Sequence, residues 1–255
     1  MSPAASEIAL STRGLGKRFG SLVVANDIAI ELPKGVRYAL IGPNGAGKTT
    51  LINLMTGMLA PDRGQIFLGN EDITALEPQE RVRRGLARTF QINTLFPGLT
   101  ALEAVTLAVA ERRGVAGEFW TNLGVHQESI EEAYEILAKL RLGDDCYSPT
   151  RELPYGRQRL LEIALALATK PRVLLLDEPA AGVPQEESGD IFEAVANLSG
   201  DLTLLFIEHD MHVVFRFASH IIVLVGGAIF ATGSPAEIAA DPGVREVYLG
   251  TRHHG

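Results

Sequence analysis

Cysteine is nearly absent from this sequence, which holds one, Cys146, among 255 residues. A single thiol can form neither an internal disulfide nor a cysteine-rich metal site, and it fits a reducing compartment. We interpret Cys146 as a packing or surface thiol.

Long apolar runs are also missing. No stretch approaches the roughly 20 apolar residues that a helix needs to span a bilayer. The N-terminal MSPAASEIALSTR also lacks a basic segment followed by an apolar one, which a secretory signal would show. We therefore expect a soluble chain, whose association with a membrane would come through a partner.

An excess of basic residues is the third absence. The chain carries 23 Lys and Arg against 31 Asp and Glu, a net charge of −8. Neutralising phosphates requires clustered basic side chains, so this composition argues against a protein that holds nucleic acid by a broad basic surface and leaves local basic patches open. With 46% hydrophobic and 21% charged residues, the chain is long enough for a large core, and we expect an α/β domain carrying a smaller subdomain.

The most informative stretch that is present is VRYALIGPNGAGKTTL, residues 36–51. It predicts a buried strand, a glycine-rich turn and the start of a helix, the context in which G-x-x-x-x-G-K-[ST] binds phosphate. Glycines let successive backbone N–H groups face one anion, with the helix N-terminus behind them. Lys48 would then reach the β- and γ-phosphates, and Thr49 would ligate Mg²⁺. The turn consists of Gly42, Pro43, Asn44, Gly45, Ala46, Gly47, Lys48 and Thr49.

Ahead of this motif, Ile8–Leu15 and Val23–Leu32 are rich in β-forming residues. They predict an antiparallel hairpin whose turn is Lys17–Gly20. Phe19 lies in that turn, where an exposed aromatic can stack on a purine. On this observation alone, a place in the core is the favoured interpretation of Phe19.

Two later strands end in polar residues. The apolar run 173–176 leads to Asp177 and Glu178, and the run 202–207 leads through Glu208 to His209. Such runs are typical of parallel sheets, whose carboxyl ends form ligand sites. There Asp177 would order Mg²⁺ and Glu178 would activate a water. A histidine in this place can donate to a γ-phosphate, although a lone histidine after a strand is more often structural.

Gln91 follows a third predicted strand, 86–90. At the carboxyl end of a central strand its amide would reach Mg²⁺ or the attacking water, but position alone leaves this open. Beyond it, residues 92–152 predict helices without strands, one from Thr100 and one over 126–142. Further helices are predicted over 49–58, 77–84, 158–169, 188–197, 211–219 and 235–240, and further strands over 65–68, 221–225 and 228–232.

Phe119 and Trp120 stand together in the glycine-flanked stretch 114–124, between the two helices of this insertion. Neighbouring aromatics in such a loop can form a contact with a partner protein. Local packing explains them equally well, and both interpretations remain open.

Taken together, these motifs resemble the nucleotide-binding subunit of an ABC transporter over nearly the whole chain. The matching features are Walker A (Gly42–Thr50), the Q-loop (Gln91), a helical insertion, the signature (Leu153–Arg157), Walker B (Val173–Asp177, then Glu178) and the switch His209. More narrowly, RTFQ, DEPAAG, IEHDM and the ending VREVYLG resemble the Liv-type ATP-binding subunits of branched-chain amino acid importers. Those subunits are themselves similar to urea-type and lipopolysaccharide-export ATPases.

The resemblance implies a P-loop NTPase fold of the ABC ATPase type. Such a fold has a parallel core sheet, an antiparallel β subdomain and an inserted α-helical subdomain. We expect the first part of the ATP-binding core over 1–91, the helical subdomain over 92–157 and the second part of the core over 158–255.

The resemblance also implies ATP and Mg²⁺ as cofactors, and a role for each matching residue. Phe19 would stack on adenine, in contrast to the interpretation that its position alone favours. Nucleotide contacts would come from residues Gly42 to Thr50 and from Tyr155 and Gly156, catalytic groups from Glu178, His209 and Gln91, and Mg²⁺ ligands from Thr49, Gln91 and Asp177.

In such a family, two ATPase subunits close face to face on two ATP molecules. Each ATP then lies between the Walker motifs of one subunit and the signature of the other. The implied partners are two multi-span permease subunits, a second ATPase and, indirectly, a solute-binding protein, with no nucleic acid. The implied location is the cytoplasmic face of the inner membrane.

Three residues differ from the residues that the family usually has in these motifs. The signature commonly reads L-S-G-G-Q, or L-[SA]-Y-G-Q in the Liv-type group, whereas this chain has Pro154 and Arg157. Pro184 stands where Asp or Asn usually follows Walker B. Because Pro154 has neither a serine hydroxyl nor an N–H, a homodimer would lack these donors at both ATP sites. We therefore expect a heterodimer with a related ATPase, in which Arg157 is a candidate extra cation.

Other functions remain in competition with an importer ATPase. A related exporter ATPase shares the motifs, and the sequence does not identify the transported solute. A soluble ABC ATPase acting on nucleic acid or ribosomes usually needs coiled-coil arms or a second cassette, which this chain lacks. A P-loop small-molecule kinase would explain neither LPYGR nor EHD.

Overall fold

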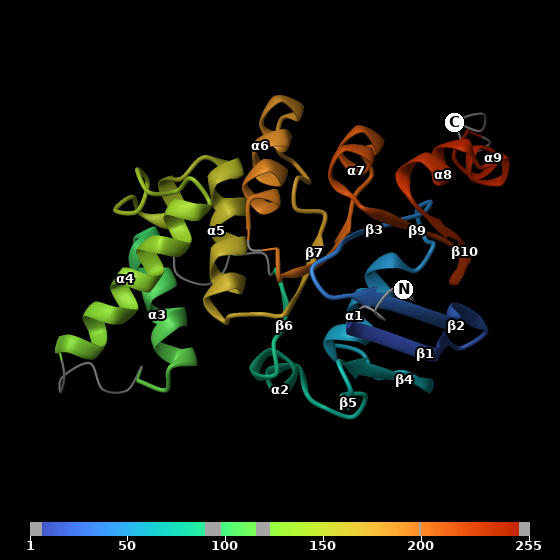
Figure 1. Cartoon of the computed structure of the whole chain (residues 1–255), viewed down its shortest axis with the longest axis horizontal. Helices are drawn as coiled ribbons and strands as arrows, with labels where there is room; N and C mark the ends of the chain where they lie inside the picture. Colours follow the sequence, from blue (N-terminus) through green and yellow to red (C-terminus); the bar gives the residue numbers. More distant parts are fainter. Residues whose placement is uncertain (1–6, 90–97, 116–122, 199, 250–255) are drawn as a thin grey trace, which may run out of the picture. The chain divides into compact units, whose positions relative to one another are not determined.

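The computed structural model describes residues 7–89, 98–115, 123–198 and 200–249 (Figure 1). The chain divides into two units. The first comprises residues 1–86, 172–178 and 200–255, and the second comprises 87–171 and 179–199. The domain limits expected from the sequence stay a prediction.

An antiparallel sheet in the order β2-β1-β4-β5 belongs to the first unit. The predicted hairpin forms, but its turn lies later than expected, because Lys17, Arg18 and Phe19 continue to pair with the second strand. Leu22 and Val23 are themselves β-forming, and Gly20 provides the positive φ of +58° that a tight turn needs. The strands are β1 (Ile8–Phe19), β2 (Leu22–Pro33), β4 (Arg63–Leu68) and β5 (Glu71–Asp72).

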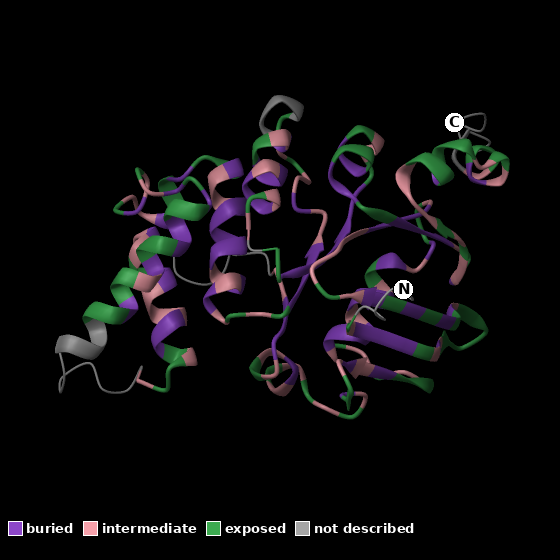
Figure 2. Ribbon diagram, in the orientation of Figure 1, coloured by how far each residue is buried: buried purple, intermediate pink, exposed green. Residues whose placement is uncertain are grey.

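A six-stranded sheet in the order β10-β9-β3-β8-β7-β6 carries the predicted parallel strands. Its central strands pair in parallel and are almost wholly buried, as their continuous apolar runs predict (Figure 2). The strands are β3 (Arg37–Ile41), β6 (Leu86–Arg88), β7 (Val173–Asp177), β8 (Thr203–Ile207), β9 (His220–Val225) and the antiparallel edge strand β10 (Ala228–Gly233).

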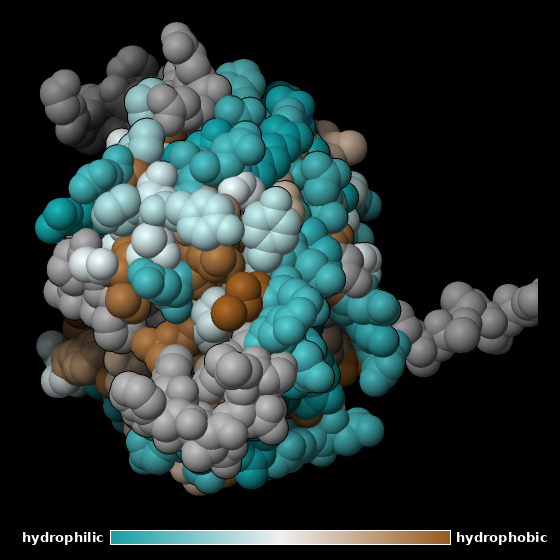
Figure 3. All heavy atoms as spheres, turned by 90° about the vertical axis from the view of Figure 1, so that its left-hand side faces the viewer, coloured by the Kyte–Doolittle hydropathy of each residue, from teal (hydrophilic) through white to brown (hydrophobic). Residues whose placement is uncertain are grey.

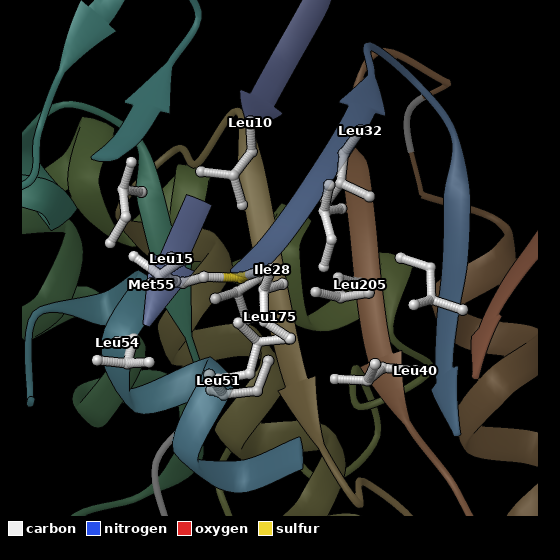
Figure 4. Close-up of a cluster of buried hydrophobic side chains, with 14 of the residues drawn as sticks. Leu10, Leu15, Ile28, Leu32, Leu40, Leu51, Leu54, Met55, Leu175 and Leu205 are labelled. Carbon is white, nitrogen blue, oxygen red and sulfur yellow. The ribbon is translucent and has the colours of Figure 1, made fainter. Parts of the chain in front are cut away.

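The helix α1 (Lys48–Thr56) shares one hydrophobic core with both sheets. Figure 4 shows its Leu51, Leu54 and Met55 among leucines and isoleucines of the two sheets. The helix ends before the predicted residue 58, since Gly57 adopts a left-handed φ of 80° at the C-cap. The phosphate-binding motif is thus attached directly to the core of the first unit.

Short helices complete the first unit. They are α2 (Pro78–Arg83), α7 (Met211–Phe217), α8 (Pro235–Ala240) and α9 (Pro242–Leu249). The last of these was not predicted, although Pro242 at its start is a common first helical residue. Within the described part of the chain, no helix has both the length and the apolar character that crossing a membrane requires.

The second unit is helical, as predicted. Thr100 and Glu103 form a capping box at the start of α3, the residue at which the sequence predicts this helix to begin. Figure 1 shows α3, α4 and α5 side by side, with buried residues such as Val105, Leu137 and Leu161. The bounds are α3 (Ala101–Arg112), α4 (Leu123–Lys139), α5 (Tyr155–Ala168) and α6 (Gln185–Ala196).

The face over α3 and α4 mixes apolar and polar side chains (Figure 3). Its exposed large hydrophobic residues include Ile130 and Tyr134 of α4. Phe119 and Trp120 lie outside the described residues, so both interpretations of this aromatic pair remain open.

The helix α5 begins at Tyr155, three residues before the predicted start at Gln158. Pro154 is its N-cap, with φ −54° and ψ 151°, and Gln158 N–H already donates to the Pro154 carbonyl at 3.0 Å. Proline is compatible with a helix start because the N–H that it lacks has no intrahelical partner there. Tyr155 and Gly156 therefore belong to the first turn of a helix.

Candidate functional site

The turn 42–47 is held by close backbone approaches. A Cβ on Gly42 would lie 2.1 Å from the Leu224 carbonyl oxygen, and one on Gly47 would lie 2.4 Å from that of Val24. Gly47 is the N-cap of α1 with φ 100°, a conformation that residues with a side chain rarely adopt. Only glycine fits at these two positions, so the backbone itself fixes the turn.

Lys48, the first residue of α1, is 7% exposed. Its Nζ donates to the carbonyl oxygens of Gly42 at 2.7 Å and Pro43 at 3.1 Å. Burial lowers the pKa of Lys48, and the charges of Glu178 and Asp177 oppose that shift. The ammonium is therefore a buried cation held against the turn itself, with two carboxylates nearby.

The other motif residues lie around the start of α1. Asn44, Gly45 and Thr49 are exposed, whereas Ala46 is buried and its carbonyl accepts from Gly227 N–H at 3.0 Å. Thr49 and Thr50 belong to the first turn of α1, which carries no acidic residue. The first N–H groups of a helix have no intrahelical partner, and together with the positive end of the helix dipole they make the start of α1 suited to an anion.

The carboxyl ends of three neighbouring strands meet at the edge of the sheet that bears this turn. In the order β3-β8-β7, all pairings are parallel. The phosphate-binding turn follows β3, Asp177 ends β7, and His209 follows β8 two residues after its end. The structure thus brings Lys48, Asp177, Glu178 and His209, which the sequence predicts as site residues, to one edge of the first unit.

Glu178 and His209 contact each other directly. Oε1 of Glu178 lies 2.6 Å from Nε2 of His209, and the side chains are 38% and 49% exposed. Glu178 has a left-handed φ of 49°, and its N–H donates to the Ile207 carbonyl at 3.2 Å. A non-glycine residue in this region costs on the order of 1–3 kcal/mol, so the backbone at Glu178 is strained and its N–H bond to the neighbouring strand helps to hold it there.

Magnesium fits this edge with oxygen ligands only. Among the described residues, no group of three or more His, Cys, Asp and Glu side chains gathers as a metal cage. Mg²⁺ in nucleotide sites takes one or two protein oxygens together with phosphate oxygens and waters. The exposed hydroxyl of Thr49 and the carboxylate of Asp177, whose charge acts on Lys48, are such a set.

Phe19, the last residue of β1, is 52% exposed. The placement in the core that its position alone favours is therefore wrong, because the strand ends at the hairpin turn and its last side chain has no layer to pack under. Lys17 Nζ lies 5.8 Å from the centre of the Phe19 ring and 2.7 Å from Asp62 Oδ1. An exposed aromatic face of this kind is suited to stacking on a flat ring.

The signature residues lie in the second unit. Gly156 is buried and Tyr155 is 39% exposed, both in the first turn of α5. Arg157 pairs within its own unit, since it donates to the Arg141 carbonyl and its Nε lies 3.5 Å from Asp145 Oδ2. Gln91 lies outside the described residues, so its expected role stays a prediction.

Two buried arginines were missed from the sequence. Arg81 of α2 is 2% exposed and donates to four carbonyls, two of them at the C-terminal end of α1. Arg159 is 8% exposed and pairs with Glu162 of the same helix at 2.8 Å. Arg159 and Glu162 are three residues apart on one helix. This i,i+3 spacing could have predicted their contact from the sequence, but not their burial.

Comparison with known proteins gives matches over most of the chain. Residues 25–181 match the family model of the ABC transporter, and residues 228–254 match that of the branched-chain amino acid ATP-binding cassette transporter. The high-affinity branched-chain amino acid transport ATP-binding protein BraF of Pseudomonas aeruginosa is 38% identical over 250 residues, covering 94% of this chain and 97% of that protein. The corresponding LivG of Escherichia coli is 37% identical, with 96% and 99% covered.

Solved structures agree with these matches. An ATP-binding cassette of an ABC transporter in its ADP conformation superposes with a TM-score of 0.84 at 35% identity, covering 96% of this chain and 100% of that one. A nucleotide-free ATP-binding cassette gives a TM-score of 0.82 at 33% identity, with 94% and 98% covered. The predicted fold class is confirmed.

Proposed function

The chain belongs to the ABC transporter family of ATP-binding subunits, and we propose that it hydrolyses ATP to power uptake of branched-chain amino acids through a membrane permease. The observation that carries this proposal is the single edge of the parallel sheet at which a buried lysine, two strand-end residues Asp177 and Glu178, and His209 meet. Membership of the ABC ATPase family supports hydrolysis as the reaction.

The turn 42–47 and the start of α1 would bind the phosphates. Their N–H groups and the Lys48 ammonium supply positive charge where the β- and γ-phosphates lie, and phosphoryl transfer depends chiefly on such positioning and charge. Mg²⁺, held by Thr49 and Asp177, would supply further neutralisation of phosphate charge. Phe19 would cover the adenine ring.

Glu178 would accept a proton from the attacking water. In the structure, the carboxylate of Glu178 is paired with Nε2 of His209 at 2.6 Å. When His209 donates to a γ-phosphate instead, Glu178 becomes available to the water. The pair therefore links activation of the base to the presence of ATP.

Two observations support branched-chain amino acids as the transported solute. The curated relatives that cover nearly the full chain are named as branched-chain amino acid transport proteins, and the C-terminal residues match a family model of the same name. Permease subunits and a place on the cytoplasmic face of the membrane follow from this function. A separate solute-binding protein would select the amino acid.

We further propose that this chain pairs with a second, related ATPase. Pro154 offers no hydroxyl and no N–H, and Arg157 is engaged by Asp145 and the Arg141 carbonyl. The signature can then offer a partner's ATP only the N–H groups near Tyr155 and Gly156. A heterodimer has this shortage at one ATP site, whereas a homodimer has it at both.

Purified transporter, isolated through a tag on the permease, tests both proposals. We expect two ATPase species by intact mass, ATP hydrolysis stimulated by leucine-loaded binding protein, and leucine uptake in proteoliposomes. Lys48→Ala should lose most ATP binding or turnover, since a buried charge-assisted contact to phosphate is missing. A single ATPase species, active as a symmetric pair, would refute the heterodimer, and a complex without ATPase activity would refute the function.

A further inference from the structure

The buried side chain of Arg159 joins two segments of the second unit. Its Nη1 donates to Glu162 Oε2 at 2.8 Å and its Nη2 to the Tyr155 hydroxyl at 2.7 Å. The same Nη2 lies 3.5 Å from the carbonyl oxygen of Ala181. One guanidinium thus contacts the first turn of α5 and the segment between Asp177 and α6.

Tyr155 contacts both this guanidinium and that segment. The Arg159 guanidinium carbon lies 5.0 Å from the centre of the Tyr155 ring. A Cβ on Gly182 would lie 3.1 Å from Tyr155 Cε1, and Gly182 has a φ of +77°. The backbone at Gly182 therefore lies directly against the ring, where a side chain would not fit without movement.

Stability alone does not explain this arrangement. Removing an ion pair from water is costly, and well-packed apolar residues in its place are often as stable or more so. Arg159 Nε is also buried, and within the described part of the chain it has no hydrogen-bond partner. A buried charge with an unsatisfied donor calls for a reason other than stability.

Pro154 supplies such a reason. As the N-cap of α5 it makes no side-chain hydrogen bond to the first turn, which a serine or threonine would do. The orientation of that turn then depends on Tyr155, which contacts both Arg159 and the backbone at Gly182. The ion pair with Glu162 in turn fixes the direction of the Arg159 fork.

We propose that Arg159 is a positioning residue for ATP hydrolysis: by clamping Tyr155 against the backbone at Gly182, it presents the first turn of α5 and the segment after Glu178 to the nucleotide of the paired subunit in one fixed arrangement. This proposal rests on the proposed function, because it concerns the ATP that two paired subunits share. Arg159 is buried and its contacts are with Glu162, Tyr155 and Ala181, so we expect it to act on turnover rather than on ATP binding by this chain's own Walker motifs.

Kinetics of the intact transporter in lipid nanodiscs test the proposal with Arg159→Lys and Tyr155→Phe. Lysine keeps a positive charge for Glu162 but lacks the fork that reaches Tyr155. We expect kcat to fall roughly five- to tenfold for Arg159→Lys, about the value of one charge-assisted hydrogen bond, while KM for Mg-ATP stays within about twofold. Tyr155→Phe should lower kcat by less, and the double variant should be no worse than Arg159→Lys, because both remove the same contact.

Arg112→Lys is the matched control. Arg112 pairs with Glu132 at 2.6 Å in the same unit, but on α3 and α4. We expect its kcat to equal that of the wild type, with a change in melting temperature similar to that of Arg159→Lys.

Equal kcat values for Arg159→Lys, Arg112→Lys and the wild type would overturn the proposal while leaving the function intact. Loss of kcat in both variants in proportion to melting temperature would also overturn it, since the effect would then be general destabilisation. A wild-type complex that does not hydrolyse ATP would instead refute the proposed function itself.

Discussion

The helices α1 and α5 begin in different ways, although both starts are expected to face ATP. Backbone contacts hold the start of α1, where Gly42 and Gly47 lie against carbonyl oxygens of neighbouring strands. Side chains hold the start of α5. The N-cap Pro154 makes no side-chain hydrogen bond to the first turn, and the hydrogen bond from Arg159 to the Tyr155 hydroxyl holds that turn instead. A backbone-held turn has no room to adapt, whereas a side-chain-held turn can relax. Substitutions should therefore have severe effects at α1 and graded ones at α5.

Gly42→Ala should have the largest effect, because its Cβ would lie 2.1 Å from the Leu224 carbonyl oxygen and the backbone must move. We expect ATP affinity to fall at least about a hundredfold, since the turn loses the geometry that directs its N–H groups at phosphate. Calorimetric titration with Mg-ATP measures this. Gly45→Ala is the control: no atom lies within 4 Å of its Cβ, so only the strain of φ +77° remains. Equal affinities for the two variants would show that the backbone contacts do not fix the turn.

Glu178→Gln separates the chemical step from the positioning of ATP, because it removes the proposed general base and leaves the starts of α1 and α5 unchanged. The amide cannot accept the water's proton, so hydrolysis in the assembled transporter should fall at least about a hundredfold, while ATP still binds. Glu71→Gln, in an exposed pair with Arg84, serves as control and should retain full activity. Near-normal turnover by Glu178→Gln would contradict its assignment as the general base.

Gly182→Ala tests the α5 side. The added methyl would lie 3.1 Å from Tyr155 Cε1, a contact that a shift of a few tenths of an ångström relieves, and the φ of +77° adds backbone strain. We expect kcat to fall roughly threefold to tenfold, with ATP affinity of this chain unchanged. Gly189→Ala, in α6 with open space around its Cβ, should leave kcat unaltered and raise helix stability slightly. A fall in kcat of about a hundredfold or more, as large as the fall in ATP affinity expected for Gly42→Ala, would remove the contrast between the starts of α1 and α5.

Phe19→Ala should have the smallest effect. Loss of stacking on adenine is worth about 1 kcal/mol, which is roughly fivefold in ATP affinity, and kcat at saturating ATP should not change. Leu22→Ala, at a 63% exposed position in the same hairpin, is the control for removal of apolar surface. Identical ATP affinities for the two variants would exclude Phe19 from the adenine site.

The sequence predicts the parallel sheet and its strand-end residues correctly because that information is local. Apolar runs such as 173–176 are bounded by the polar residues that follow them, and adjacency at one edge then follows from parallel pairing. The start of α5 was predicted too late, since Pro154 was not taken as a cap and the helical pattern was counted only from Gln158.

The buried arginines were beyond sequence reasoning for a different reason. Arg81 looks like a surface residue of a short polar helix, between other charged residues. Its carbonyl partners come from two segments: Leu54 and Met55 at the end of α1, which approach Arg81 only in the fold, and Thr74 and Leu76 just before α2. Whether a charge is buried depends on such remote partners, which no local pattern reveals.

Arg81 also affects the electrostatic potential at the phosphate-binding end of α1. Its guanidinium covers the carbonyls of Leu54 and Met55, where the negative end of the helix dipole would otherwise oppose bound phosphate. A nine-residue helix is roughly 13 Å long, and a unit charge at that distance contributes about 1 kcal/mol toward an anion at an effective dielectric constant of 20. We therefore expect Arg81 to add a long-range attraction for bound phosphate from the opposite end of the helix.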